Sequence, residues 1–257
     1  MIVIGHRGAC QEALENTWES FNKCLDMGCH RIELDLRLSK DKQVFVLHNP
    51  TTKKVSDKNW QITKKKSSEL LELVLINHET LPRLEDLLKI LPKIELNLEL
   101  KGLDTNLAVL VGEALKETPL QEKIIVSSFN RRQLQRFKDT CPDVQTALLW
   151  AKGPKLTKNP ILTCKQLAIK ICHPEFYALS PSLMQTIRSA GLRVYPWISL
   201  KDEKKHPEKI WEKLVALKVD GFCTNYPREM MNWLKARGEL DPCSETTPYP
   251  QAGNPTA

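Results

Sequence analysis

The strongest constraint on the fold is the regular alternation of two hydrophobic patterns along the 257 residues. Short apolar or alternating segments, which are typical of strands, lie at 2–4, 31–38, 44–48, 94–100, 124–128, 146–150, 167–171, 192–198 and 221–224. Segments with the period of an amphipathic helix lie at 17–27, 84–91, 106–115, 130–138, 181–190, 207–217 and 227–236. Roughly eight strand–helix units at this length predict an α/β fold, a single-domain (β/α)8 TIM barrel, rather than an open doubly wound sheet.

Two segments interrupt this alternation. Residues 49–80 form a long connection that carries six lysines and Trp60. Long connections inside compact domains are often functional loops. Residues 241–257 are rich in Pro, Thr and Ser without periodicity, which predicts a disordered polar tail. We therefore expect one barrel domain over 1–240, with a basic loop insertion at 49–80 and the tail after it.

Composition excludes several classes of function. The net charge of +7 favours an anionic ligand, but no basic strip alternates with aromatic residues, so no nucleic-acid partner is expected. No apolar run approaches the ~18 residues of a transmembrane segment, and no basic region followed by an apolar one opens the chain. The eight cysteines lack CxxC or zinc-finger spacing, which favours reduced thiols. These features predict a cytoplasmic protein.

Two predicted strands carry polar side chains at alternate positions. In RIELDLRL, Glu33 and Asp35 share one face, and in IELNLELK the shared positions are Asn97, Glu99 and Lys101. Helices cover the outside of a parallel barrel, so these polar faces point inward. Buried carboxylates are costly unless they are paired with cations or with a metal. We predict a Mg²⁺ or Ca²⁺ site made by Glu33, Asp35 and Glu99, with interior salt bridges as the alternative.

Histidines stand at two of the predicted strand ends. His6 ends the first strand and His48 ends VFVLH, at positions where the catalytic residues of TIM barrels gather. Beside the carboxylates and the cations Arg7 and Lys101, they predict an acid/base pair in an anion-binding pocket. His173 follows another strand and could line the same site. The remaining histidines fall at polar, turn-like positions and are expected in solvent: His30, His78 and His206.

The order of these motifs resembles that of the glycerophosphodiester phosphodiesterase family. HRG, ENT, the E-x-D of IELDL, the histidine of VLHNP and the E-x-K of NLELK occur in the family order. Ser128-Phe129, Trp197 and the segment DGFCTNYP extend the resemblance, which runs from Gly5 to about Pro227. That family adopts a TIM barrel and hydrolyses glycerophosphodiesters to glycerol 3-phosphate and an alcohol, usually with a divalent metal.

The resemblance implies a role for each matched residue. His6 and His48 would be the general base and the general acid, and Arg7 and Lys101 would hold the phosphate oxygens. The implied ligands of the divalent cation, Mg²⁺ or Ca²⁺, are Glu33, Asp35 and Glu99. The implied substrate-binding residues at the same end of the barrel are Glu15, Asn16 and Trp197, with Trp197 beside the glycerol or alcohol group.

Three residues depart from the family pattern in ways that bear on substrate preference and rate. Asn49 follows the second histidine where the family usually has Asp. Leu200 replaces the asparagine of W-T-V-N, and Asn225 replaces the aspartate of T-D-x-P. The segment LENT also differs mildly from PENT. None of these changes removes a predicted metal ligand, phosphate binder or acid/base residue.

The sequence leaves several alternatives open. The basic insertion could make weak contact with a lipid surface, in which case the substrate would be a lysophospholipid and the activity like that of a lysophospholipase D. A non-catalytic barrel that binds a phosphorylated metabolite is the other alternative. The nucleophile could be water or a neighbouring hydroxyl of the substrate. The alcohol group, the choice between Mg²⁺ and Ca²⁺, and the oligomeric state also stay open.

Overall fold

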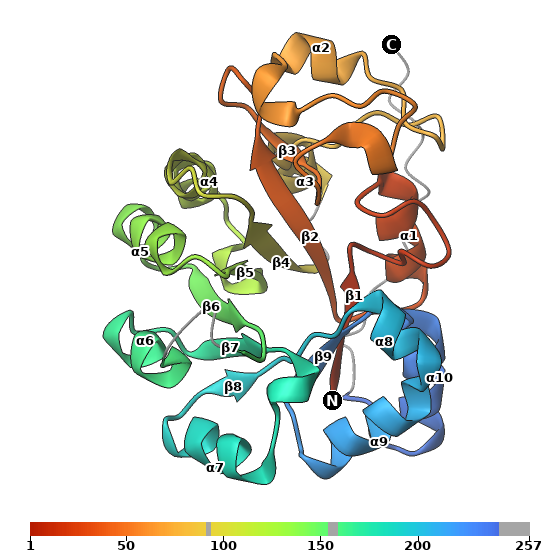
Figure 1. Ribbon diagram of the computed structural model, residues 1–257, viewed down its shortest axis with the longest axis vertical. Helices are drawn as coiled ribbons and strands as arrows, with labels where there is room; N and C mark the ends of the chain where they lie inside the picture. Colours follow the sequence, from red (N-terminus) through yellow and green to blue (C-terminus); the bar gives the residue numbers. More distant parts are fainter. Residues whose placement is uncertain (91–93, 154–158, 242–257) are drawn as a thin grey trace.

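A computed structural model describes residues 1–90, 94–153 and 159–241, so the predicted tail lies outside the described residues except for its first one. Eight parallel strands form a nearly closed barrel (Figure 1). They are β1 (Ile2–His6), β2 (Arg31–Leu38), β4 (Glu95–Leu100), β5 (Ile124–Ser128), β6 (Gln145–Trp150), β7 (Ile171–Pro174), β8 (Arg193–Val194) and β9 (Gly221–Thr224). Their order is β8-β7-β6-β5-β4-β2-β1-β9. The predicted single-domain TIM barrel is confirmed.

The two edges of this sheet meet at Trp197. β8 has only two residues, and the chain then passes through Pro196, which has no N–H to donate to a strand ladder. Beyond it, Trp197 makes parallel bridges to Glu175 and to Cys223. The Trp197 N–H donates to the carbonyl of Pro174, and the Cys223 N–H donates to that of Pro196, each over 3.0 Å. Trp197 thus connects the β7–β8 edge of the sheet to the β9 edge.

One predicted barrel strand is not part of the barrel. The strand predicted at 44–48 is β3 (Val44–Val46), which pairs antiparallel with β2. Only residues 39–43 separate the two strands, whereas a parallel crossover needs about a dozen residues. The chain reverses there through Lys42, whose φ is 66°. The apolar pattern therefore predicted the strand correctly, although β3 is not one of the parallel strands of the barrel.

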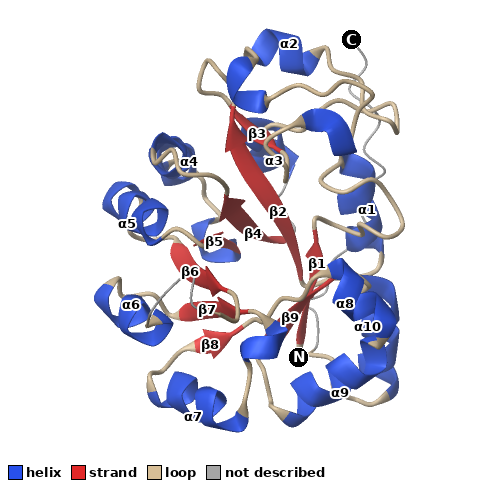
Figure 2. Cartoon of the chain, in the orientation of Figure 1, coloured by secondary structure: helices blue, strands red, loops and turns tan. Residues whose placement is uncertain are grey.

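The helices surround the barrel and cover its outer face (Figure 2). They are α1 (Trp18–Asp26), α3 (Leu84–Ile90), α4 (Asn106–Lys116), α5 (Arg131–Thr140), α6 (Pro160–Gln166), α7 (Pro181–Ser189), α8 (Leu200–Lys205), α9 (Pro207–Ala216) and α10 (Pro227–Ala236). Outward-facing side chains of β2 such as Ile32, Leu34 and Leu36 are fully buried against them. Each such side chain contributes about 1.5–3 kcal/mol through the hydrophobic effect.

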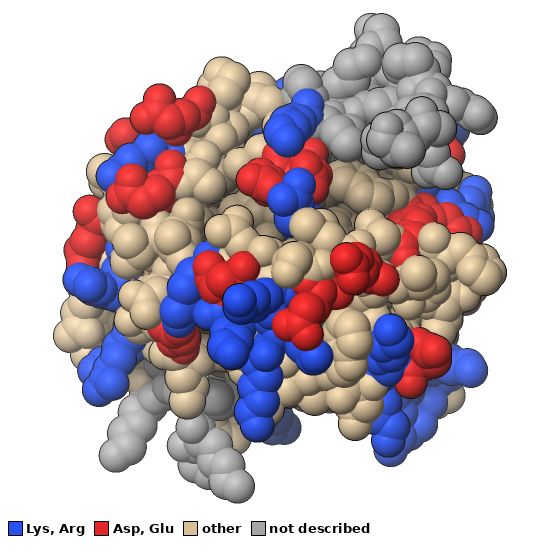
Figure 3. Space-filling view, turned by 90° about the horizontal axis from the view of Figure 1, so that it is seen from above, with Lys and Arg blue, Asp and Glu red and all other residues tan. Residues whose placement is uncertain are grey.

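The insertion, residues 49–80, is folded rather than a plain loop. It contains two short 3-10 turns, Thr52–Lys54 and Ile62–Lys64, and the helix α2 (Ser67–Leu71). It shares a small apolar core with β3 and the residues that flank the insertion, made by Phe45, Leu47, Val55, Ile62, Leu70, Leu73, Leu75 and Leu81. On the side of the molecule where α2 lies, Lys and Arg are intermixed with Asp and Glu (Figure 3). This side therefore carries no uniformly basic surface in that view.

Two further features of the described residues bear on the sequence predictions. None of the helices there combines the length and the apolar composition that a membrane crossing requires. The cysteines that the structure describes are free thiols: Cys10, Cys24, Cys29, Cys141, Cys164, Cys172 and Cys223. Most of them are buried, where a cysteine packs as a small apolar residue.

Candidate active site

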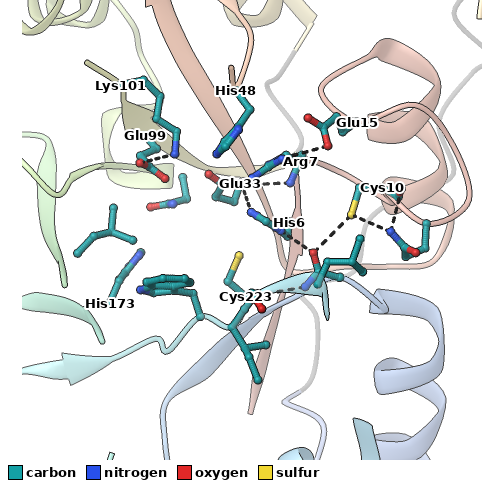
Figure 4. Close-up of a pocket in the computed structure, with 18 of the residues that line it drawn as sticks. His6, Arg7, Cys10, Glu15, Glu33, His48, Glu99, Lys101, His173 and Cys223 are labelled. Atoms are coloured by element: carbon teal, nitrogen blue, oxygen red, sulfur yellow. Dashed lines mark hydrogen bonds and ion pairs between the residues drawn. The ribbon is translucent and has the colours of Figure 1, made fainter. Parts of the chain in front are cut away.

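The polar residues of β1, β2 and β4 meet at one end of the barrel because the three strands are in parallel register. His6 pairs with Glu33, and Asp35 pairs with Glu99 across the next ladder. The side chains of His6, Glu33 and Glu99 line a cavity of about 550 Å³, which we call the site cavity, and Asp35 is buried next to the two glutamates. Figure 4 shows the labelled histidines, carboxylates and cations converging on this space. The predicted inward orientation of both polar strand faces is thus observed.

Three carboxylates form a compact acidic cluster, of which Glu33 and Glu99 line the site cavity and Asp35 does not. Oxygen atoms of Glu33, Asp35 and Glu99 lie within 4.8 Å of one another, and all three residues are buried. Burial and the neighbouring charges of Asp35 and Glu99 raise the pKa of Glu33 well above its usual range. Oε1 of Glu33 has no hydrogen-bond partner among the described residues. An all-oxygen donor set with an unsatisfied buried carboxylate fits a hard divalent cation.

Two cationic side chains border the acidic cluster. Nζ of Lys101 lies 3.0 Å from Oδ1 of Asp35 and 2.6 Å from Oε1 of Glu99. Nε of Arg7 lies 3.3 Å from Oδ2 of Asp35, and Nη1 of Arg7 donates to Oε2 of Glu15 over 3.0 Å. Burial opposes both positive charges, but the nearby carboxylates raise the pKa of Lys101 and of Arg7 above their ordinary values. Both residues therefore present permanent positive charge to the cavity.

The same cations stabilise the charged form of Asp35. Burial by itself would raise the pKa of this carboxyl group, yet Lys101 and Arg7 hold it well below its usual range. Asn16 supports the same carboxylate, since its Nδ2 donates to Oδ2 of Asp35 over 2.8 Å. Asn16 is buried behind Asp35 and is not part of the cavity lining, whereas Glu15 lines the cavity and pairs with Arg7.

The segment after β1 is bent sharply, and the bend directs Arg7 toward the site cavity. Arg7 and Gly8 have φ values of 56° and 79°, and Asn16 has a φ of 60°. For arginine and asparagine this left-handed backbone conformation costs of order 1–3 kcal/mol each. The N–H of Arg7 donates to Oε2 of Glu33 over 3.1 Å, and Thr17 caps α1 through the N–H of Ser20. The predicted helix start at ENT is therefore correct, and it lies at the same end of the barrel as the site cavity.

Both strand-end histidines line the site cavity. Nδ1 of His6 lies 2.7 Å from Oδ1 of Asn225, and Nε2 lies 3.9 Å from Oε2 of Glu33. Burial and the charge of Arg7 lower the pKa of His6 to about 3, so its ring is neutral and can accept a proton. Nδ1 of His48 lies 2.8 Å from Oδ1 of Asn49, and burial lowers the pKa of His48 as well.

The far wall of the site cavity is apolar. Trp197 and Phe129 pack edge to face, with ring centroids 5.6 Å apart, and Leu200 also lines the cavity. The predicted substrate-binding residue Trp197 therefore lines the cavity. His173 lines it too, as the sequence left open; burial lowers its pKa to about 3.

Other residues near the site were not predicted from the sequence. Lys54 of the insertion lines the cavity and pairs with Glu15. Glu203 of α8 lies behind His6, next to Asn225. Lys54 was one of six similar lysines and Glu203 one acid in a charged stretch, so neither position carried a specific signal. His30, expected in solvent, is half-buried instead, since its Nδ1 accepts a hydrogen bond from the N–H of Val3.

Comparisons with known proteins agree with this geometry. Residues 6–229 match the Glycerophosphoryl diester phosphodiesterase family. A glycerophosphodiester phosphodiesterase of Caldanaerobacter subterraneus subsp. tengcongensis is 25% identical over 249 residues, which cover 92% of this chain and 99% of that protein. A lysophospholipase D of Rattus norvegicus is 31% identical over 273 residues, which cover 90% and 85%.

A solved structure shares the fold. It is that of an Oleispira antarctica phosphodiesterase in complex with the product sn-glycerol-3-phosphate. The two structures superpose with a TM-score of 0.82 at 23% identity, over 91% of this chain and 97% of that one. The match over nearly the whole chain confirms the resemblance seen in the sequence motifs. This chain belongs to the glycerophosphoryl diester phosphodiesterase family, whose members are phosphoric diester hydrolases.

Proposed function

We propose that this chain is a metal-dependent glycerophosphodiester phosphodiesterase with His6 and His48 as its acid/base pair. Its substrates are small diesters such as glycerophosphocholine or glycerophosphoethanolamine, and its products are glycerol 3-phosphate and an alcohol. The observation that supports this most strongly is one cavity that brings two permanent cations and two histidines next to the cluster of three carboxylates. A cavity of about 550 Å³ is large enough for a diester of this size.

The acidic cluster supports binding of Mg²⁺ or Ca²⁺ by Glu33, Asp35 and Glu99. When bound, the cation supplies positive charge that polarises a phosphoryl oxygen. Lys101 already neutralises Asp35 and Glu99, so a cation entering the cluster competes with its ammonium group. With a cation held by these carboxylates, the ammonium group of Lys101, which lines the cavity, would be available to the substrate phosphate.

Charge development at the phosphate is balanced by Arg7 and Lys101. The donors of Arg7 are held in place before the reaction by Glu15 and Asp35, so this residue needs little reorganisation as negative charge grows. His6 accepts the proton of the attacking oxygen, which belongs to water or to a neighbouring hydroxyl of the substrate. His48, in its protonated form, gives a proton to the leaving alkoxide and becomes neutral. Trp197 and Phe129 offer an apolar wall to the glycerol or alcohol group.

A chelation assay with two variants tests the proposed function. The purified protein should release glycerol 3-phosphate from glycerophosphocholine, lose this activity with EDTA and regain it with Mg²⁺ or Ca²⁺. His6→Ala and His48→Ala should each lower kcat by at least about 100-fold, within the range of general acid/base catalysis. His78→Ala, which replaces an exposed histidine in the insertion, is the matched control.

Two outcomes would contradict parts of this proposal. Near-normal turnover in a folded His6 or His48 variant would remove the proposed acid/base pair. Binding of glycerol 3-phosphate without any turnover, with either metal ion present, would favour the non-catalytic barrel instead.

A lysophospholipase D-like activity is the second candidate, and one structural feature favours it. A groove of about 1160 Å³ shares Glu99, Lys101 and Phe129 with the site cavity. Its lining includes Leu162 and the 86% exposed Leu103, which could contact an acyl chain. The rat relative supports the same candidate. Hydrolysis of glycerophosphocholine and of lysophosphatidylcholine by one preparation, compared through kcat/KM, separates the two.

A further inference from the structure

A buried carboxylate with no part in the proposed chemistry lies behind His6. Glu203 of α8 is fully buried and is not among the described residues that line the site cavity. Its Oε1 accepts hydrogen bonds from the Thr224 hydroxyl and from Nε1 of Trp211. Its Oε2 accepts from the backbone N–H and from Nδ2 of Asn225, each over 2.8 Å. Four donors therefore converge on its two oxygens, an arrangement suited to an ionised carboxylate.

This carboxylate determines which way the Asn225 side chain faces. Nδ2 of Asn225 points to Oε2 of Glu203 and, at 3.4 Å, to the carbonyl of Ile198. Both groups only accept hydrogen bonds when Glu203 is ionised. A flipped amide would place Oδ1 against their lone pairs and would lose the bond to Glu203. Oδ1 therefore faces the other way, where it lies 2.7 Å from Nδ1 of His6.

The orientation of the amide in turn selects the tautomer of His6. Oδ1 of Asn225 can only accept, so Nδ1 of the neutral ring must carry the proton. Nε2 then has a free lone pair, and it lies on the cavity side, 3.9 Å from Oε2 of Glu33. A general base needs an unprotonated nitrogen directed at the reacting group.

We propose that Glu203 is a positioning residue that orients the Asn225 amide and thereby holds His6 in the Nδ1–H tautomer. This inference rests on the proposed role of His6 as the general base. It also explains how the chain works with asparagine at position 225. An aspartate there would accept from Nδ1 through either oxygen, whereas an asparagine accepts only when its amide is held in one orientation.

The variant Glu203→Gln tests the relay with a change of one atom. Glutamine has one acceptor oxygen, but donors stand on both sides, from Trp211 and Thr224 on one and from Asn225 on the other. When its NH₂ group faces Asn225, that amide turns and donates to Nδ1 of His6, which moves the ring proton to Nε2. We expect kcat for glycerophosphocholine to fall about 10–100-fold while KM changes less than about threefold.

The double variant Glu203→Gln/Asn225→Asp should restore activity. The introduced aspartate accepts from Nδ1 of His6 without help, and its other oxygen accepts from the side-chain amide of the introduced glutamine. A residue that merely stabilised α8 would give no such rescue. Glu208→Gln, which makes the same change at an exposed position of α9, should leave both kcat and KM unchanged.

The tautomer itself can be read by ¹⁵N NMR of protein labelled at histidine, with Mg²⁺ present and His6→Gln used for assignment. Wild type and the double variant should show a protonated Nδ1 and an unprotonated Nε2 at His6, and Glu203→Gln should show the reverse. An Nε2–H tautomer in the wild type would overturn the proposal without any variant. Wild-type kcat and an unchanged tautomer in folded Glu203→Gln would overturn it as well.

The two readouts keep this inference separate from the proposed function. If the wild type releases no glycerol 3-phosphate, the proposed function fails, while the nitrogen shifts still decide whether Glu203 controls the tautomer. If the wild type is active and the tautomer does not depend on Glu203, only the positioning role fails.

Discussion

Asp35 shows how a full charge is held inside the barrel. The residue is completely buried, and its oxygens are contacted by Lys101, Arg7 and Asn16 over 3.0, 3.3 and 2.8 Å. Such pairs cost desolvation energy, so their main effect is seen when one partner is removed and an uncompensated charge is left behind. The free energy of unfolding lost when one partner of a salt bridge is removed should therefore depend on how buried the pair is, and not on the distance between its nitrogen and oxygen atoms.

A pair of lysine variants tests this dependence on burial. Lys101→Met should lower the free energy of unfolding by about 3–5 kcal/mol, because Asp35 loses a buried partner. Lys42→Met breaks an exposed pair of similar length, 2.7 Å to Asp104, and should cost at most about 1 kcal/mol. Urea denaturation in EDTA measures both. If the two variants lost the same free energy of unfolding, the dependence on burial would be contradicted.

His173 gives a prediction for the pH dependence of stability. Burial and the charge of Arg31 lower its pKa to about 3, against an ordinary value of 6.5. Below about pH 6.5 the unfolded chain binds a proton at this histidine and the folded chain does not, so stability falls as the pH falls toward 3. This residue contributes a slope of about 1.4 kcal/mol per pH unit.

The variant His173→Leu should remove that slope. Nε2 of His173 is buried without a hydrogen-bond partner among the described residues, so an apolar side chain of similar size should change stability little at neutral pH. Between about pH 6 and 4, the variant should lose stability less steeply than the wild type in urea denaturation. An identical slope in both proteins would contradict the buried, neutral state of this ring.

The insertion, residues 49–80, is the element whose structure the sequence analysis did not predict. Its lysines and Trp60 predicted a basic loop, but the ammonium groups of Lys58 and Lys65 lie over the Trp60 ring, 4.8 and 4.4 Å from its centroid. Beneath them, the apolar core of the insertion packs against β3. Its apolar residues are too irregularly spaced to show a helix or strand period, which is why the pattern did not reveal a folded unit.

Two isoleucines of the insertion provide a matched test of this core. Ile62 is fully buried and Ile76 is 60% exposed. Ile62→Ala should lower the free energy of unfolding by about 2–5 kcal/mol through lost burial and a residual cavity. Ile76→Ala should change it by less than about 0.5 kcal/mol. If both substitutions were equally mild in urea denaturation, the insertion would not be a cooperative part of the fold.

At the scale of the molecule, the sequence predicted the barrel and most of the site because both depend on short-range periodicity. The alternation in β2 and β4 required Glu33, Asp35 and Glu99 to face inward, and strand ends required His6 to lie beside them. Contacts between distant segments could not be predicted in this way. Asn225 meets His6 because β9 pairs with β1, and Glu203 contacts Asn225 from α8.

Cation binding should appear as a change in the stability of the whole molecule. A ligand that binds only the folded state stabilises it by about 2.7 kcal/mol at 100 times its Kd. For a chain of this size that corresponds to a rise in Tm of about 5–10 °C. We therefore expect millimolar Mg²⁺ or Ca²⁺ to raise Tm relative to EDTA in calorimetry. No rise with either ion would contradict the proposed metal site.

The variant Glu33→Gln should distinguish the destabilising effect of the acidic cluster in the absence of a cation from its role in binding one. In EDTA its Tm should equal or exceed that of the wild type, because Glu33 is buried beside two other carboxylates and its Oε1 is unpartnered among the described residues. The glutamine can still accept from the N–H of Arg7. It should nevertheless lose most of the rise caused by the cation, while Glu208→Gln keeps it. The opposite result would be a Glu33→Gln protein that is less stable than the wild type in EDTA but is still stabilised by Mg²⁺ or Ca²⁺. The cluster would then bind the ion without this carboxylate, and Glu33 would stabilise the fold rather than bind the cation.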